Sequence, residues 1–195
     1  SPYEFFERHV WAREPAMFRG AAKNWSLGVV WDDAYLDRVY GNLTVLVEDK
    51  KDNRDVPAGE MLLSDFLSRY KQDSLFLVSQ TPSPMLEEIP LFPLLNVEAL
   101  QGHLTESNVW LSAGGTVSTM HEDADDNVNC LLQGTKRWFF VKEQFRDLLA
   151  MEDPKLSSAF SVLDMDALDI QAHPEILKAP YRTLEAHAGD CVYLP

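Results

Sequence analysis

One segment of this sequence, from Ser118 to Val141, constrains the fold more than any other. Polar and apolar residues alternate along two stretches of it, and alternation with a period of two is typical of β-strands. The dipeptide Gly134-Thr135 between them predicts a two-residue type II′ turn, so we predict a hairpin with Gln133 opposite Lys136. One face would carry four polar side chains among apolar groups, namely Asn127, Asn129, Gln133 and Lys136. Two interpretations remain open: this face holds a ligand, or Lys136 faces solvent.

A histidine and a carboxylate stand at the head of this segment. His121 and Asp123 are two residues apart, and in an extended strand such residues point to the same side. Together they can supply two of the three ligands of a two-His-one-carboxylate site, the usual holder of non-haem Fe(II). Glu122 occupies the alternate position and is predicted to face away from them. Because an H-x-D triplet also arises by chance in a chain with five histidines, the assignment depends on the surrounding residues.

Those surrounding residues carry a family resemblance. The pattern S-x-x-H-x-D, with Asn127 six residues after His121 and Q-G-x-K ending at Lys136, resembles the JmjC (cupin-like) 2-oxoglutarate oxygenases. It is most similar to the small protein-hydroxylase branch that includes the asparaginyl hydroxylase of the hypoxia-inducible factor. The resemblance implies that His121 and Asp123 bind Fe(II). It also implies that Lys136, assisted by Ser118 and Asn127, binds the distal carboxylate of the cosubstrate 2-oxoglutarate, with O2 as the second cosubstrate.

The resemblance covers nearly the whole chain and implies an α+β fold. Its core would be a double-stranded β-helix (a jelly-roll), preceded by N-terminal helices. We predict one domain over residues 1–195, with a helical and strand portion over about 1–105 and the metal-binding barrel core over about 106–195.

Two positions depart from the family pattern. In relatives the third metal ligand is a histidine a few residues beyond the last-strand proline, and the sequence ends at Pro195, before that position and before the end of the barrel. We expect the natural chain to continue with this histidine; the alternatives are that His173 or His187 reaches the metal, or that the chain is an inactive relative. Phe76 lies near the place where relatives often have a tyrosine that contacts 2-oxoglutarate, and phenylalanine cannot make that hydrogen bond.

We therefore predict an Fe(II)- and 2-oxoglutarate-dependent oxygenase that hydroxylates a protein side chain. An N-methyl-lysine demethylase of the same family and a non-catalytic cupin-like binding protein are the alternatives. The formal net charge of −14 disfavours nucleic acid as a partner. We expect a protein or peptide substrate, and the acidic residues between Glu122 and Asp126 favour a basic one.

Other features bear on the compartment and on local structure. No apolar run is long enough to span a membrane, and we expect an intracellular protein, cytoplasmic or nuclear. Cys130 and Cys191 are predicted to be free buried thiols, with a disulfide as the alternative. The polar stretch 49–55 is predicted to be a solvated loop, or a lid over the substrate. The sequence predicts helices over 2–10, 31–39, 61–70 and 143–151, and strands over 16–18, 43–48, 74–80, 108–112, 181–185 and 190–194.

Overall fold

The computed structural model describes residues 2–48, 59–97, 100, 102–152, 160–165 and 167–195. The chain divides into two compact units. Unit 1 contains Tyr3–Asn24 and Ser118–Pro195, and unit 2 contains Trp25–Val117. The prediction of a single domain with a division near residue 105 stays a prediction; the units place the first 24 residues with the C-terminal half of the chain.

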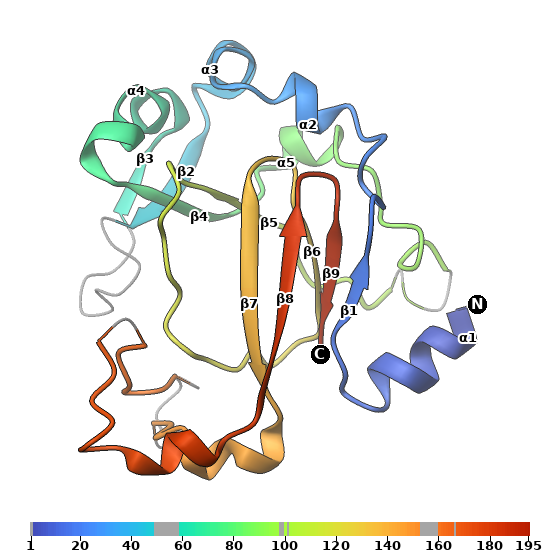
Figure 1. Ribbon diagram of the computed structural model, residues 1–195. Helices are drawn as coiled ribbons and strands as arrows, with labels where there is room; N and C mark the ends of the chain where they lie inside the picture. The colour runs from blue at the N-terminus through green and yellow to red at the C-terminus, as the bar shows by residue number, and fades with distance from the viewer. Residues whose placement is uncertain (1, 49–58, 98–99, 101, 153–159, 166) are drawn as a thin grey trace. The chain divides into compact units, whose positions relative to one another are not determined.

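Unit 2 is a four-stranded antiparallel sheet, in the order β3-β2-β4-β5, accompanied by short helices (Figure 1). Its elements are α2 (Leu27–Val30), α3 (Asp33–Tyr40), β2 (Thr44–Glu48), β3 (Gly59–Leu62), α4 (Leu63–Asp73), β4 (Phe76–Gln80), α5 (Ser83–Leu86) and β5 (Asn108–Leu111). Helix α3 begins two residues after the predicted start at 31, because the Asp32 carboxylate accepts the Tyr35 N–H at 2.7 Å as an N-cap. Helix α4 buries its apolar stripe, with Phe66 fully buried.

A carboxylate surrounded by aromatic side chains fixes the segment after α5 in unit 2. Glu88 accepts the Trp31 indole N–H at 2.6 Å and the Tyr35 hydroxyl. The Tyr35 hydrogen bond, followed by that of Trp31, lowers the pKa of Glu88 below its ordinary value. Burial, followed by the nearby Glu88 carboxylate, raises the pKa of Tyr40 well above its ordinary value. These contacts join the proline-rich stretch after β4 to the helical layer of the unit.

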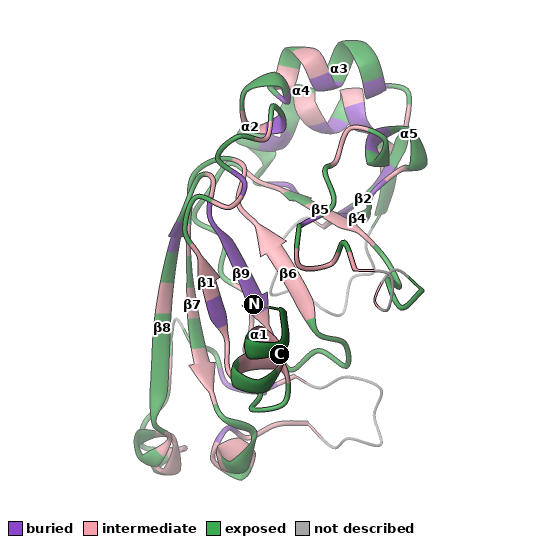
Figure 2. Ribbon diagram, turned by 90° about the vertical axis from the view of Figure 1, so that its right-hand side faces the viewer, coloured by how far each residue is buried: buried purple, intermediate pink, exposed green. Residues whose placement is uncertain are grey.

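Unit 1 contains two antiparallel sheets, which form two layers in Figures 1 and 2. Its elements are α1 (Pro2–Phe5), the π-helix η1 (Phe6–Val10), β1 (Ala16–Phe18), β6 (Asn127–Cys130), β7 (Thr135–Val141), the 3₁₀-helices η2 (Glu143–Leu148) and η3 (Pro174–Lys178), β8 (Tyr181–His187) and β9 (Cys191–Leu194). Strand β9 lies between β1 and β6, and β7 pairs with β8 alone. Phe5 packs edge-on against Tyr193, at 5.1 Å between ring centroids, so the N-terminal helix covers one face of β9.

The predicted hairpin between residues 127–133 and 136–141 is wrong. Strand β6 pairs with β9, whereas β7 pairs with β8, so the segment around Gly134 passes from one sheet to the other instead of closing a hairpin. Alternation sets which side chains share a face and leaves the partner strand undetermined. The single face predicted for Asn127, Asn129, Gln133 and Lys136 fails with the hairpin, since β6 and β7 belong to different sheets. Within β7 Lys136 lies opposite Ala186, which has no exposed surface, so Lys136 is on the inward face of that strand.

The prediction of free thiols is also corrected, because Cys130 and Cys191 form a disulfide. They are directly opposite each other in the β6–β9 pair, with their Cα atoms 4.0 Å apart. Such closeness is typical of a non-hydrogen-bonded antiparallel pair. The expected intracellular compartment favours free thiols, whereas the register of β6 and β9 brings the two sulfur atoms together.

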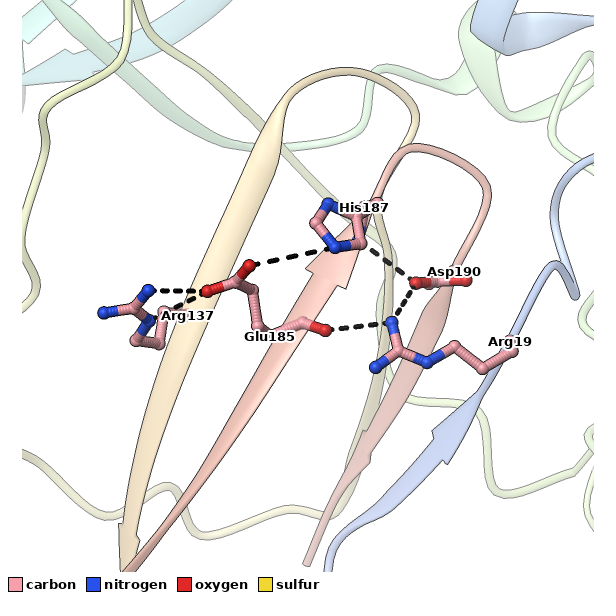
Figure 3. A network of polar contacts seen from close by, with 5 residues as sticks. All are labelled: Arg19, Arg137, Glu185, His187 and Asp190. Atoms are coloured by element: carbon pink, nitrogen blue, oxygen red, sulfur yellow. Dashed lines mark hydrogen bonds and ion pairs between the residues drawn. The ribbon is translucent and has the colours of Figure 1, made fainter.

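A polar network closes the turn between β8 and β9 (Figure 3). The Asp190 carboxylate accepts the backbone N–H groups of Gly20 at 2.8 Å and His187 at 3.1 Å, and it pairs with Arg19 at 2.6 Å. These backbone donors, in that order, lower the pKa of Asp190 to about 2. Arg19 also donates to the backbone carbonyl of Glu185 at 2.9 Å. The network thus ties the end of β1 to β8 and β9.

Most of the predicted elements are present, with altered ends and in some places another helix type. The predicted helix over 2–10 is an α-helical turn continued by a π-helix, and the one over 143–151 is the 3₁₀-helix η2. The sequence does not predict α2, β3, α5 and η3, which are only four or five residues long. The predicted loop or lid at 49–55 lies outside the described residues. In the part of the chain that the structure describes, no helix is long and apolar enough to cross a membrane.

Candidate metal and cosubstrate site

The two predicted metal ligands lie side by side in unit 1. The Nε2 atom of His121 is 3.6 Å from Oδ1 of Asp123, so both side chains point to the same side as the spacing predicts. The segment is not a regular strand, because His121 makes only an isolated bridge to Phe160. The Nδ1 atom of His121 lies 2.7 Å from the Thr119 carbonyl oxygen. Since a carbonyl can only accept, Nδ1 carries a proton, and in the neutral ring the lone pair is then on Nε2, the nitrogen nearer to Asp123.

This donor set fits two positions of a metal site. Two atoms that each lie about 2.1 Å from one metal are about 3 Å apart at a right angle, close to the observed separation. Asn127 Nδ2 donates to Asp123 Oδ2 at 3.5 Å, which leaves Oδ1 on the side of His121. A hydrogen-bonded imidazole and carboxylate are typical of oriented metal ligands. Among the residues that the structure describes, no group of three or more His, Cys, Asp or Glu could hold a metal, so neither His173 nor His187 completes the set.

The acidic residues beside the ligands are largely engaged. Oε1 of the Glu122 carboxylate accepts Arg146 Nε at 2.9 Å, and the direction of Glu122 relative to the ligand pair stays a prediction. Asp126 accepts the Tyr193 hydroxyl at 2.6 Å. Burial, followed by this contact, raises the pKa of Tyr193 well above its ordinary value. The acidic run is therefore partly structural, and the basic-substrate prediction stays a prediction.

The predicted cosubstrate lysine lies on β7, in the β7-β8 sheet of unit 1. Lys136 is half-buried on the inward face of β7, and its Nζ is 5.0 Å from the centroid of the Trp138 ring. An ammonium at that distance from an indole face is held by a cation–π interaction. Ser118 is half-buried three residues before His121. Hydrogen bonds and ion pairs link His121, Asp123 and Asn127 to one another, whereas Lys136 and Ser118 are brought into the same unit through the fold.

Some residues of the site carry no signal in the sequence. Thr119, whose carbonyl fixes the His121 tautomer, and Arg146, which pairs with Glu122, form no motif with the ligands. Trp138 lies two residues after Lys136 and hence on the same face of the strand, but the sequence alone does not mark it as a partner of the lysine. Phe76 is buried on β4 of unit 2.

The sequence of this chain was compared with families of known proteins. Residues 2–195 match the cupin-like domain family. The chain belongs to this family. Because the match covers more than half of the chain, it confirms the predicted α+β jelly-roll fold class. The cupin-like assignment also agrees with the mixture of short helices and antiparallel sheets described above.

Relatives of this cupin-like domain are JmjC proteins. Jumonji C domain-containing protein 5 of Drosophila melanogaster is 28% identical over 209 residues, which cover 98% of this chain and 52% of that protein. Lysine-specific demethylase 8 of Xenopus tropicalis is 26% identical, over 98% of this chain and 45% of that protein. The bifunctional peptidase and (3S)-lysyl hydroxylase JMJD7 of Homo sapiens is 23% identical, over all of this chain and 75% of that protein. The chain thus spans about half the length of the first two relatives, and the predicted JmjC family is confirmed.

Proposed function

We propose that this cupin-like domain is the catalytic part of an Fe(II)- and 2-oxoglutarate-dependent oxygenase that hydroxylates a protein side chain. The observation that carries the proposal is the orientation of His121 and Asp123. The imidazole Nδ1 is engaged by the Thr119 carbonyl, which leaves Nε2 as the nitrogen open to a metal, and Asp123 Oδ1 lies 3.6 Å from it. Such an arrangement suits two ligands of one divalent metal ion.

Each residue of the site has a proposed task. His121 and Asp123 hold the metal, and Asn127 keeps the Asp123 carboxylate turned towards it. Lys136 pairs with the distal carboxylate of 2-oxoglutarate, with Ser118 and Asn127 as further hydrogen-bonding groups. Trp138 shields the Lys136 ammonium from water on one side, which strengthens that pairing. When bound, Fe(II) and 2-oxoglutarate supply the oxidising chemistry that puts one atom of O2 into a substrate C–H bond and the other into succinate, with release of CO2.

The relatives indicate which substrates to try first. The names of two of them, a lysine-specific demethylase and a (3S)-lysyl hydroxylase, both refer to lysine. We therefore propose a lysine side chain in a protein as the first substrate class for this chain. Removal of an N-methyl group from lysine begins with hydroxylation of that group, so one site geometry serves either reaction. Mass spectrometry of treated peptides separates them: hydroxylation adds one oxygen atom, and demethylation removes one CH₂ and releases formaldehyde.

The test of the cosubstrate site is calorimetric titration of 2-oxoglutarate into Mn(II)-loaded protein in the absence of oxygen. The protein is produced together with any natural sequence that follows Pro195. We expect binding that requires the metal and is weakened at least about 100-fold in Lys136→Ala, because a buried carboxylate then loses its cation. Arg137→Ala is the matched control, since Arg137 pairs with Glu185 on the opposite face of β7. A folded protein that binds no 2-oxoglutarate would support the non-catalytic cupin instead.

A further inference from the structure

The residue between the two proposed metal ligands is held by a helix that follows in the sequence. Glu122 accepts a hydrogen bond from Arg146 of η2, at 2.9 Å from Nε to Oε1. The Arg146 side chain is 26% exposed and that of Glu122 is 44% exposed, so the pair is partly shielded from water. Because His121 and Asp123 are the chain neighbours of Glu122, fixing Glu122 also restricts both of them.

A second contact joins the end of the same helix to the residue before His121. Ser161 is almost completely buried, and its backbone N–H donates to the Met120 carbonyl at 2.8 Å. The Ser161 hydroxyl donates to the Leu149 carbonyl, just after η2, at 2.6 Å and accepts the Leu163 N–H at 3.0 Å. Ser161 therefore connects the ligand segment and η2 through backbone groups on both sides.

The ring of Phe160 completes this support. Its centroid lies 5.3 Å from that of His121, and the two residues form an isolated antiparallel bridge. The imidazole is thus held at Nδ1 by Thr119 and packed along its ring by Phe160. A ligand pair outside a regular strand has no ladder of its own to fix its geometry, so it depends on such contacts.

We infer that Arg146 is a positioning residue for the metal site: through Glu122 it fixes the segment that presents His121 and Asp123 to the metal. The inference rests on the proposed function and assigns part of that site to a residue that touches neither metal nor substrate. Within the part of the chain that the structure describes, the buried Nη2 atom of Arg146 has no hydrogen-bond partner. The cost of burying this atom offsets much of what the Arg146–Glu122 pair contributes to global stability. We therefore expect loss of the pair to change the metal affinity more than the free energy of unfolding.

The test is titration of the purified protein with Mn(II), read by electron paramagnetic resonance, and with Co(II), read by visible absorption. For Arg146→Gln we expect the dissociation constant for each ion to rise about tenfold, as for other residues that orient ligands. The matched control is Arg137→Gln, which breaks an arginine–glutamate pair of similar geometry, with contacts of 3.0 and 2.6 Å, on the outer face of β7. We expect less than about a twofold change there. An unchanged dissociation constant in Arg146→Gln would overturn the inference.

A measurement without metal separates this inference from the proposed function. Amide hydrogen exchange of residues 119–123 in the metal-free protein should become about tenfold faster in Arg146→Gln and stay unchanged in Arg137→Gln. If the wild-type protein binds neither ion, the proposed metal site fails, and with it the role of Arg146 towards a metal. Faster exchange would then leave Arg146 as a support of the segment alone. Should Arg146→Gln fail to fold, Glu122→Gln breaks the same pair from the other side and is judged by the same criteria.

Discussion

Asp190 gives the clearest prediction about stability, because its carboxylate is nearly buried and accepts three charged or backbone donors. Its side chain is 9% exposed, and the pKa is lowered from the ordinary value of 3.8 to about 2. A difference of one unit between the pKa values of the folded and unfolded states corresponds to about 1.4 kcal/mol. The ionised Asp190 carboxylate therefore contributes about 2 kcal/mol to the free energy of unfolding at neutral pH. Asp190→Asn keeps the shape of the side chain but replaces one acceptor oxygen by an NH₂ group, which faces the donors of Gly20, His187 or Arg19. We expect the free energy of unfolding to fall by about 2 kcal/mol.

The pH dependence follows from the direction of this change. Since the folded pKa is lower than the unfolded pKa, the contribution is complete well above pH 3.8 and is lost as the pH falls towards 2. Wild type and Asp190→Asn should therefore differ most at pH 7 and about half as much near pH 3. In a chain of 195 residues, 2 kcal/mol corresponds to a shift of about 4–8 °C in the unfolding midpoint.

The assay is thermal unfolding followed by circular dichroism at several pH values between 7 and 3. Glu185→Gln is the control, because it removes an exposed ion pair with Arg137 from the same network and should leave the midpoint close to that of the wild type. The reasoning fails if Asp190→Asn unfolds at the wild-type temperature at pH 7. It fails equally if the difference between the two proteins is the same at pH 3 as at pH 7.

Three further predictions concern other parts of the fold. Glu88→Gln should lower the unfolding free energy by about 1–2 kcal/mol and alter the fluorescence of Trp31, because one hydrogen-bond acceptor becomes a donor; urea titrations with both readouts test this. Gly189→Ala should cost about 1–3 kcal/mol, since φ is +93° and the added Cβ would lie close to backbone atoms, and a wild-type melting temperature would contradict it. Thiol titration in denaturant should find no free thiol before reduction and two afterwards, from Cys130 and Cys191.

The parts of the fold that the sequence predicts are those controlled by neighbouring residues. The N-cap at Asp32 and the apolar stripe of α4 both act within a few residues, and both helices form within three residues of their predicted ends. The pairing of β6 and β7 could not be predicted in the same way, because the partner residues of these strands lie between 40 and 67 positions away in the sequence. The Cys130–Cys191 disulfide depends on that same distant register.

In the candidate site, too, the local spacing of residues could be predicted and the contacts from distant residues could not. The spacing of His121 and Asp123 predicts that they share a side, and this holds even though the segment is not a regular strand. The supporting contacts of Arg146 and Ser161 come from residues 24 and 41 positions further along the chain, counted from Glu122 and Met120 respectively. No local pattern marks such residues, so only the folded arrangement shows them.

The strand order of unit 1 has a consequence for how the protein is made. Strand β9 lies at the centre of the β1-β9-β6 sheet, yet it is the last of the described strands to leave the ribosome. Until it emerges, β1 and β6 lack the neighbour with which they pair, while unit 2 is a continuous stretch of chain and can already fold. Synthesis thus separates the two units in time, and the proposed metal segment acquires its neighbouring sheet only after β9 has been made.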